Sequence, residues 1–180
     1  MGRTARLPCV ERGKQVTARE VIELLQLQPH PVEGGFFRET YRSQATLPAS
    51  ALPDHPGARS VSTAIYYLLT PETVSALHTL PGDEVFHFYL GDPVQMLQLW
   101  PDGSTKKLLL GTDLRAGQLV QTVVPAGVWQ GSILLEGGQF ALLGATMAPG
   151  FDYADYVTGQ REELSVKYPQ VRELIEHLCR

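Results

Sequence analysis

From residue 35 to residue 147 the chain alternates apolar and polar residues, in short runs separated by Gly, Pro and Asp. An alternation with a period of two is typical of β-strands that bury one face, and the intervening residues favour chain reversal. No helical pattern separates one run from the next. Strands that follow one another without helices pair antiparallel in a sandwich or barrel, so the sequence predicts an all-β domain.

Nine strands are expected in this region, each rich in β-branched, aromatic or aliphatic residues. They lie near residues 35–42, 60–69, 73–79, 84–90, 94–100, 105–111, 118–124, 128–135 and 139–147. The turn sequences Pro101-Asp-Gly103 and Glu136-Gly-Gly138 predict two tight hairpins, because these residue types tolerate the backbone angles of a reversal.

A peripheral helix is expected at each end of the β region. Thr17 and Glu20 form a capping-box pattern, in which each side chain satisfies a free backbone donor at a helix start. Pro29 ends the apolar pattern that follows. Near the C-terminus, apolar residues from Val171 to Leu178 recur at helical spacing, and Pro169 suits the first turn of that helix.

The chain has 180 residues, 43% of them hydrophobic, which suits one domain with a substantial core. We interpret residues 17–180 as a single domain and residues 1–16 as a flexible lead-in or the cut edge of a longer protein. The net charge is −4 with both signs interspersed, so a nucleic-acid partner is not expected. No apolar run approaches the length of a membrane span or of a secretory signal. Cys9 and Cys179 form neither a disulfide framework nor a zinc spacing, which favours a reducing, cytoplasmic location.

The segment from His78 to Gly91 carries the strongest indication of a functional site. His78, Glu84 and His87 place three side chains able to bind a metal or move a proton within ten positions. A second turn and strand, from Pro125 to Gln130, follows about forty residues later. The two segments are interpreted as two halves of one pocket.

These two segments resemble the two motifs of the cupins, in which small jelly-roll barrels hold a metal or a small molecule at the open mouth. The spacing of His78, Glu84 and Gly91 is similar to the first motif, and Pro125-x-Gly127-x-x-Gln130 to the second. Residues 18–160 resemble more specifically cupin family 5, the domain of unknown function 985. The similarity is carried by four blocks in the same order: Glu33 to Arg42, Asp83 to Gly91, Pro125 to Trp129 and Ala148 to Phe151.

The resemblance implies a double-stranded β-helix, the RmlC-like jelly-roll barrel, paired into homodimers and without an established reaction. Metal-binding cupins usually present two histidines and a glutamate from the first motif and a histidine from the second. His78 and Glu84 stand at two of these places, but Leu80 and Gln130 occupy the other two. No metal cofactor is therefore expected. A divalent metal held by His78, Glu84 and His87 is the alternative, and it requires His87 to reach the same cavity.

Strand alternation decides where His87 points. On a regular strand Glu84, Phe86 and Phe88 share one face, while His87 lies on the other, unless a bulge breaks the alternation. Either Glu84 or His87 is a candidate catalytic base, although a structural or interface role is the more common one for such a histidine. His78 is open to two interpretations, a pocket residue or a core histidine, and Glu84 is favoured as a pocket residue over a surface carboxylate.

Two further side chains are candidates for ligand binding. Arg38 can anchor an anion, since its guanidinium grips a carboxylate or phosphate with two parallel hydrogen bonds, although an ion pair with Glu39 is an equal alternative. Trp129 is placed beside the second-motif turn, where an indole either contacts ligand or packs the barrel wall. The remaining histidines are interpreted as solvent or loop residues: His30, His55 and His177.

We rank four functions from these observations. First is a binding protein for a small polar or anionic metabolite, lined by Arg38, His78, Glu84, Trp129 and Gln130. Second is a metal-independent sugar isomerase or epimerase, with Glu84 or His87 as the base and Arg38 stabilising the developing enolate. Third is a divalent-metal enzyme. Last is a non-catalytic dimeric scaffold with a vestigial pocket.

Overall fold

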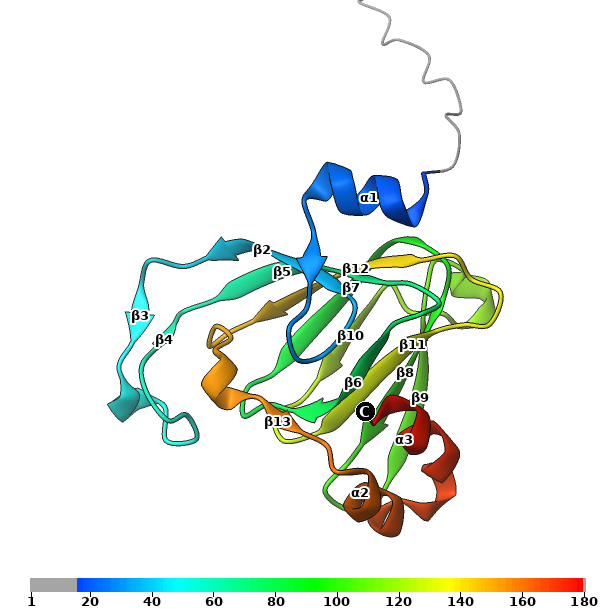
Figure 1. Ribbon diagram of the computed structural model, residues 1–180. Helices are drawn as coiled ribbons and strands as arrows, with labels where there is room; N and C mark the ends of the chain where they lie inside the picture. Colours follow the sequence, from blue (N-terminus) through cyan, green and yellow to red (C-terminus); the bar gives the residue numbers. More distant parts are fainter. Residues whose placement is uncertain (1–15, 180) are drawn as a thin grey trace, which may run out of the picture.

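A computed structural model describes residues 16–179 (Figure 1). The predicted lead-in of residues 1–16 lies outside the described residues, apart from Val16, and stays a prediction. Within this part of the chain, all nine predicted strands are confirmed. They are β2 (Phe36–Arg42), β5 (Thr63–Leu69), β6 (Val74–Thr79), β7 (Glu84–Gly91), β8 (Val94–Leu99), β9 (Thr105–Leu110), β10 (Gln121–Val124), β11 (Trp129–Leu134) and β12 (Ala141–Met147).

Four two-residue strands were not predicted, because such short pairings carry no alternation to detect. They are β1 (Gln28–Pro29), β3 (Thr46–Leu47), β4 (Arg59–Ser60) and β13 (Val157–Thr158). β3 and β4 pair with each other and project beyond the end of the barrel as a small arm (Figure 1).

The long strands form two facing antiparallel sheets. One has the order β1-β2-β5-β12-β7-β10 and the other β13-β6-β11-β8-β9. Several neighbours are far apart in sequence, as in β5 beside β12 and β6 beside β11. The predicted hairpin at Pro101-Asp-Gly103 is confirmed by the pairing of β8 with β9. The predicted hairpin at Glu136-Gly-Gly138 is wrong, because that turn connects β11 to β12 in the other sheet. The predicted all-β fold, a jelly-roll barrel or double-stranded β-helix, is confirmed. Side chains from both sheets meet in its core, including Tyr67, Phe86, Met96 and Leu143.

Helix α1 (Ala18–Leu25) begins with the predicted capping box, since the Thr17 hydroxyl accepts from the Glu20 amide and the Glu20 carboxylate accepts from the Thr17 amide. It packs over one end of the six-stranded sheet, where Val21 contacts a cluster that includes Leu68 and Leu142. The rest of that sheet's outer face is not covered by a helix (Figure 1).

The outer face of the other sheet carries the C-terminal helices. The predicted helix is present as a short 3-10 turn, Pro169–Val171, followed by α3 (Arg172–Leu178). An additional helix, α2 (Arg161–Lys167), was not predicted, because seven residues without a side-chain cap give a weak pattern. Leu164 of α2 and Ile175 of α3 pack against Leu97 and Leu99 of β8. Further 3-10 turns span Ala49–Ala51, Leu114–Ala116 and Tyr153–Asp155.

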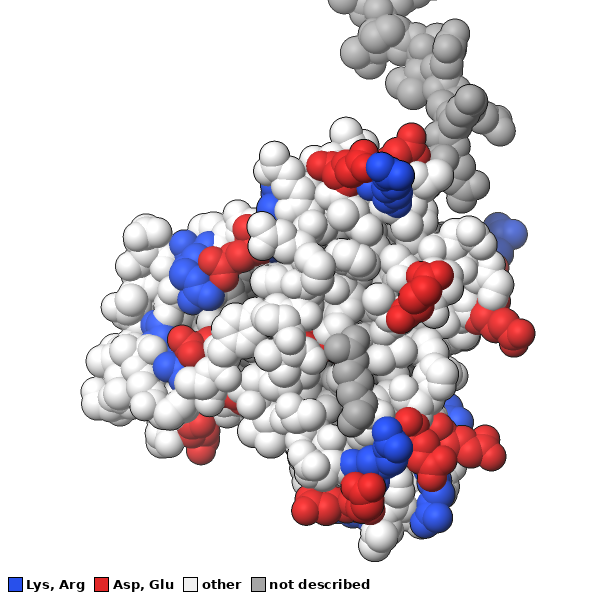
Figure 2. Space-filling model, in the orientation of Figure 1, with Lys and Arg blue, Asp and Glu red and all other residues white. Residues whose placement is uncertain are grey.

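No helix in residues 16–179 is long and apolar enough to cross a membrane. On the face drawn in Figure 2, basic and acidic side chains alternate over the surface, and the described residues form no continuous basic patch there.

Candidate functional site

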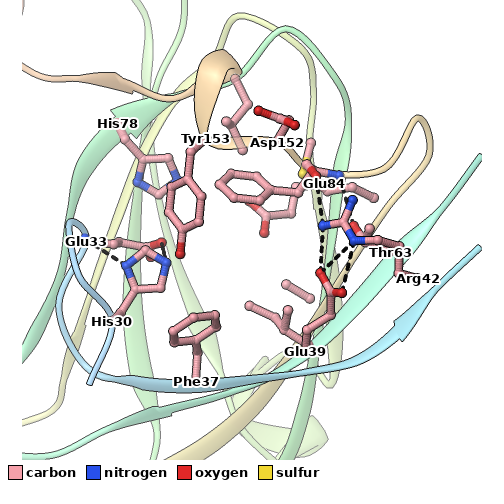
Figure 3. A pocket seen from close by; sticks show the side chains of 15 residues that line it. His30, Glu33, Phe37, Glu39, Arg42, Thr63, His78, Glu84, Asp152 and Tyr153 are labelled. Carbon is pink, nitrogen blue, oxygen red and sulfur yellow. Dashed lines mark hydrogen bonds and ion pairs between the residues drawn. The ribbon is translucent and has the colours of Figure 1, made fainter. Parts of the chain in front are cut away.

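A cavity of about 190 Å³ opens at one end of the barrel, between the six-stranded sheet and the segment that follows β12 (Figure 3). Both sheets contribute to it, and so do two loops. Its lining combines apolar and aromatic side chains with ionisable ones: His30, Glu33, Phe37, Glu39, Arg42, Thr63, Ile65, His78, Leu80, Glu84, Ala145, Met147, Phe151, Asp152 and Tyr153. The structure therefore brings His78 and Glu84 together in one pocket.

Glu84 is the first residue of β7 and lies on the inner face of its sheet, where only 8% of the residue is exposed. Gln130 of β11 donates a hydrogen bond from Nε2 to Glu84 Oε2. Burial raises the pKa of the Glu84 carboxyl group from 4.5 to about 7, while the charge of His78 and the hydrogen bond from Gln130 partly oppose this shift. Glu84 thus changes its charge near neutral pH.

His78 lies on β6 directly opposite Gln130 in the sheet register and is 2% exposed. Its Nδ1 lies 2.8 Å from the carbonyl oxygen of Ala76, and its ring stacks on Tyr156 with a centroid separation of 4.7 Å. Because a carbonyl oxygen can only accept, the neutral ring carries its proton on Nδ1. Nε2 is then a hydrogen-bond acceptor.

The residues present do not fit a cupin metal centre. Leu80 lines the pocket without a ligating atom, and the amide of Gln130 is engaged with Glu84. Residues 16–179 contain no group of three or more His, Cys, Asp or Glu side chains placed to hold a metal ion. That no metal is bound nevertheless stays a prediction.

The guanidinium of the pocket belongs to Arg42, and the structure does not place Arg38 there. The pairing of β2 with β5 shifts register between Glu39 and Tyr41. This bulge at Thr40 puts Phe37, Glu39 and Arg42 on the inner face, whereas on a regular strand Arg42 would share a face with Arg38. Arg38 lies on the outer face, with its guanidinium 5.7 Å from the centre of the Tyr66 ring.

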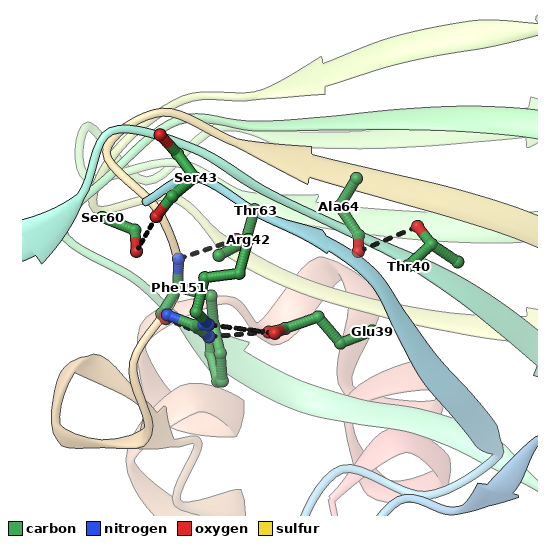
Figure 4. A network of polar contacts seen from close by, with 8 residues as sticks. All are labelled: Glu39, Thr40, Arg42, Ser43, Ser60, Thr63, Ala64 and Phe151. Carbon is green, nitrogen blue, oxygen red and sulfur yellow. Dashed lines mark hydrogen bonds and ion pairs between the residues drawn. The ribbon is translucent and has the colours of Figure 1, made fainter. Parts of the chain in front are cut away.

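Arg42 is bound by two partners at the rim of the pocket. Its Nε and Nη2 donate to the Glu39 carboxylate at 2.9 and 2.7 Å, and Nη2 also donates to the carbonyl oxygen of Phe151 at 3.2 Å (Figure 4). The Phe151 amide in turn donates to Thr63 Oγ1 at 2.9 Å. These bonds tie β2 and β5 to the segment that carries Phe151, Asp152 and Tyr153 over the cavity.

A buried ion pair holds the other end of that segment. Arg59 of β4 donates from Nε to Asp155 Oδ2 at 2.7 Å and from Nη2 to Oδ1, and the two residues are 6% and 4% exposed. Asp155 ends the 3-10 turn that begins at Tyr153. The arm formed by β3 and β4 is thereby joined to the wall of the pocket.

His30 and Glu33 form the opposite wall and were not predicted as site residues (Figure 3). His30 is 9% exposed rather than a solvent residue, and its Nδ1 accepts from the Glu33 amide at 2.9 Å. The Glu33 carboxylate accepts a short hydrogen bond from Ser75. The turn that follows uses Gly34 and Gly35 at φ of 102° and 66°, which glycine adopts readily. The Gly34-Gly35 pair was the one signal in the sequence that the chain turns here and can bring His30 and Glu33 to the cavity.

His87 and Trp129 do not line this pocket. The register irregularity of β7 against β12 falls at Tyr89, beyond His87, so alternation places His87 on the outer face. There its Nδ1 lies 3.1 Å from Gln121 Nε2. Trp129 lies on the outer face of the other sheet and packs against the cluster beneath the C-terminal helices. Gln130, its neighbour, faces inward behind Glu84.

Comparison with known proteins gives matches over most of the chain. A sequence model described as cupin superfamily (DUF985) matches residues 19–158. An uncharacterized protein of Saccharomyces cerevisiae is 34% identical over 148 residues, which cover 77% of this chain and 73% of the yeast protein.

Solved structures with the same architecture include two of similar size. A hypothetical protein from Leishmania major is 32% identical with a TM-score of 0.82, covering 91% of this chain and 99% of the other. A protein from Shewanella oneidensis is 34% identical with a TM-score of 0.81, covering 92% and 99%. Oxalate decarboxylase from Bacillus subtilis has a TM-score of 0.50 and 15% identity, covering 86% of this chain and 37% of that enzyme. At this identity the likeness concerns the fold alone.

Proposed function

This chain belongs to the DUF985 family of the cupin superfamily, and from that premise we propose that the mouth of its barrel binds a small polar metabolite. The observation that carries the proposal is the convergence of Glu84 and His78, from opposite sheets, on one cavity. Both residues are buried, and burial of ionisable groups costs free energy unless they are paired. A cavity with a few convergent polar groups among apolar walls is typical of a ligand site.

The size of the cavity limits the ligand. About 190 Å³ lies below the range of about 300–1,000 Å³ that is usual for drug-sized ligands, so a compact molecule is expected. Phe37, Ile65 and Met147 supply apolar wall, which favours a ligand with an apolar part in addition to its polar groups.

Thermal denaturation against a panel of metabolites tests this function. A ligand that binds only the folded state stabilises it by about 2.7 kcal/mol at a hundred times its Kd, and EDTA should not change the result. Glu84→Gln and His78→Ala should reduce the shift. Glu72→Gln, in the exposed turn after β5, is the matched control and should not. If no compound stabilises the protein, or if the site variants respond as the wild type does, the pocket is not a binding site.

A metal-independent isomerase or epimerase is the second candidate. The observation in its favour is the pKa of about 7 for Glu84, which suits a group that takes and returns a proton at neutral pH. Neither His87 nor Arg38 lines the cavity, so Glu84 is the base that remains, and Arg42 is the nearest guanidinium. Incubation of keto-sugars in deuterated water, with Glu84→Gln as the control, tests it. The lack of any exchange above that of the variant would exclude this candidate.

A divalent-metal enzyme, the third predicted function, receives no support from the donor set. Leucine supplies no ligand at residue 80, and the Gln130 amide already binds Glu84. We therefore derive no reaction step through a metal.

We also propose a homodimer formed through the open outer face of the six-stranded sheet. This face carries exposed apolar and aromatic side chains, among them Tyr41, Tyr89 and Val123, which are 55%, 47% and 47% exposed. Tyr89 also stacks on the ring of His87. Contiguous apolar surface of this kind marks an interaction face, and a second copy covers it symmetrically.

A reducing, cytoplasmic location is part of the same proposal. Cys179 is a buried free thiol, 5% exposed, within the described residues. Two cysteines at opposite ends of the sequence are too few for the disulfide framework that oxidising compartments favour. The interspersed charge likewise leads us to propose no nucleic-acid partner.

A further inference from the structure

The charges that surround the cavity are mostly negative. Glu33, Glu39, Glu84 and Asp152 line it, while Arg42 is the only Lys or Arg among the lining residues that the structure describes. Arg42 does not offset the other carboxylates, because it already donates twice to Glu39 and once to the Phe151 carbonyl. An anion entering this cavity would meet like charge in a partly desolvated space, where repulsion is weakly screened.

Hydrogen-bond acceptors dominate the inner wall in the same way. Within the described residues, Gln130 is the donor to the Glu84 carboxyl group, through Oε2 alone, which leaves acceptor capacity on that carboxylate. His78 donates a hydrogen bond from Nδ1 to the Ala76 carbonyl, so the neutral ring has Nε2 as its acceptor. Two acceptors from different sheets thus face a ligand that must supply donors.

The rest of the cavity lining is largely apolar and partly aromatic. Phe37 lies below the opening and Tyr153 above it (Figure 3), and Ile65, Ala145 and Met147 extend the apolar wall. A flat apolar body fits between such surfaces, and an aromatic ring gains further from edge and face contacts. The lining is therefore complementary to a molecule that combines a group rich in hydrogen-bond donors with a flat apolar part.

We propose that the pocket selects compact planar nitrogen cations, of the amidinium, guanidinium or protonated amino-heterocycle class, with the N–H donors directed at Glu84 and His78. This inference rests on the proposed binding function and names its ligand class. Of the polar or anionic metabolite expected from the sequence, it drops the anionic option, since that option depended on Arg38, which lies on the outer face. A planar pair of N–H donors matches a carboxylate with two parallel hydrogen bonds.

Three compounds of nearly the same shape distinguish the effect of ligand charge from that of ligand shape. Benzamidine is a cation, benzamide is its neutral analogue and benzoate is an anion. Isothermal titration calorimetry at pH 8, in the presence of EDTA, should give benzamidine the tightest binding. A charged hydrogen bond makes benzamidine bind about tenfold more tightly than benzamide, and benzoate should bind more weakly than either. Benzoate binding as tightly as benzamidine would overturn the inference.

The variant Glu84→Gln keeps the shape of the side chain and removes its charge. It should abolish the preference for benzamidine over benzamide, whereas Glu72→Gln removes one charge at the exposed turn after β5 and should keep the preference. Circular dichroism establishes that both variants are folded. A preference that survives in Glu84→Gln contradicts the proposed ligand class.

These outcomes are distinct from failure of the binding function. If benzamide or benzoate binds at least as well as benzamidine, the pocket binds ligands but the charge inference is wrong. If none of the three binds, the charge inference is again wrong, and the metabolite panel, which contains all charge types, decides the binding function separately.

Discussion

Gln130 donates its side-chain amide proton to Glu84 across the two sheets of the barrel, at the position where metal-binding cupins carry a histidine. In a metal-binding cupin the histidine and the glutamate at these two places both bind the metal, whereas here Gln130 donates a hydrogen bond to Glu84. The amide orients the carboxylate and opposes part of the pKa shift that burial causes. Glu84 is therefore held as a hydrogen-bonded acid.

Removing this donor should raise the pKa of Glu84 further. Gln130→Ala leaves the buried carboxylate without its hydrogen bond, which costs about 1–3 kcal/mol when the carboxylate is ionised and less when it is protonated. Carbon-13 NMR titration of labelled glutamate measures the pKa. Gln98→Ala is the control, because Gln98 is also buried but donates to the Val123 carbonyl. An unchanged Glu84 pKa in Gln130→Ala would show that the amide does not stabilise the charged form.

The raised pKa of Glu84 predicts that folding stability falls as the pH rises. Below about pH 4.5 the carboxyl group is protonated in both states, so it contributes no difference. Between 4.5 and about 7 the unfolded state loses its proton first, and the free energy of unfolding decreases. The decrease is at most roughly 3 kcal/mol, from 1.36 kcal/mol per pKa unit.

Urea denaturation from pH 4 to pH 8, of wild type and of Glu84→Gln, measures this dependence. The variant should match the wild type near pH 4 and exceed its stability above pH 7. The difference between the two curves isolates Glu84 from its titratable neighbours, because both proteins keep His78 on β6 and Glu33 in the loop between β1 and β2. Parallel curves would contradict the raised pKa.

The absence of two cupin ligands predicts that metal binding can be restored. Leu80→His together with Gln130→His supplies three imidazoles and one carboxylate, a set suited to zinc or manganese. Protein purified without a histidine tag should carry little metal as wild type and approach one ion per chain as the double variant, measured by elemental analysis. A wild-type protein that retains a full equivalent would show that the cofactor prediction is wrong.

The barrel was predictable from the sequence because alternation and turn residues are local signals. Alternation also placed His87 on the face opposite Glu84, since the irregularity of β7 falls beyond His87. The spacing of His78 and Glu84 indicated a shared pocket, although a core role for His78 was left open. Which arginine lies at the rim of the pocket was not predictable. No Gly or Pro marks the bulge at Thr40, and because of that single extra residue Arg42, rather than Arg38, lines the pocket.

Residues on loops were missed for a related reason. His30, Glu33 and Tyr153 reach the cavity through turns whose direction depends on long-range contacts, such as the pairing of Arg59 with Asp155. The sequence carries no periodic pattern for such contacts, which join residues 96 positions apart. The apolar wall of the pocket follows from the strand pattern, whereas part of its charge, from Glu33 and Asp152, depends on these loops.

The Arg59–Asp155 pair should be important for both stability and binding. Asp155→Asn leaves a buried guanidinium without a counter-charge, which costs about 3 kcal/mol or more. It should also weaken ligand binding, because Asp155 ends the turn that carries Tyr153. Glu23→Gln is the control: its partner Arg19 is exposed on α1, so the loss should be below about 0.5 kcal/mol. Equal losses for the two variants, measured by urea denaturation, would contradict the structural role of the pair.

The homodimer proposal predicts a mass of twice 19.8 kDa for the protein in solution. Val123→Glu places a charge on β10, the edge strand of the open sheet face, where burial against a second copy would be costly, so the variant should be monomeric. Leu24→Glu changes an exposed apolar residue on α1, outside that face, and should leave the dimer intact. Light scattering after size-exclusion chromatography measures both masses. A monomeric wild type, or a dimeric Val123→Glu protein with native stability, would remove this face as the interface and leave its exposed tyrosines for another role.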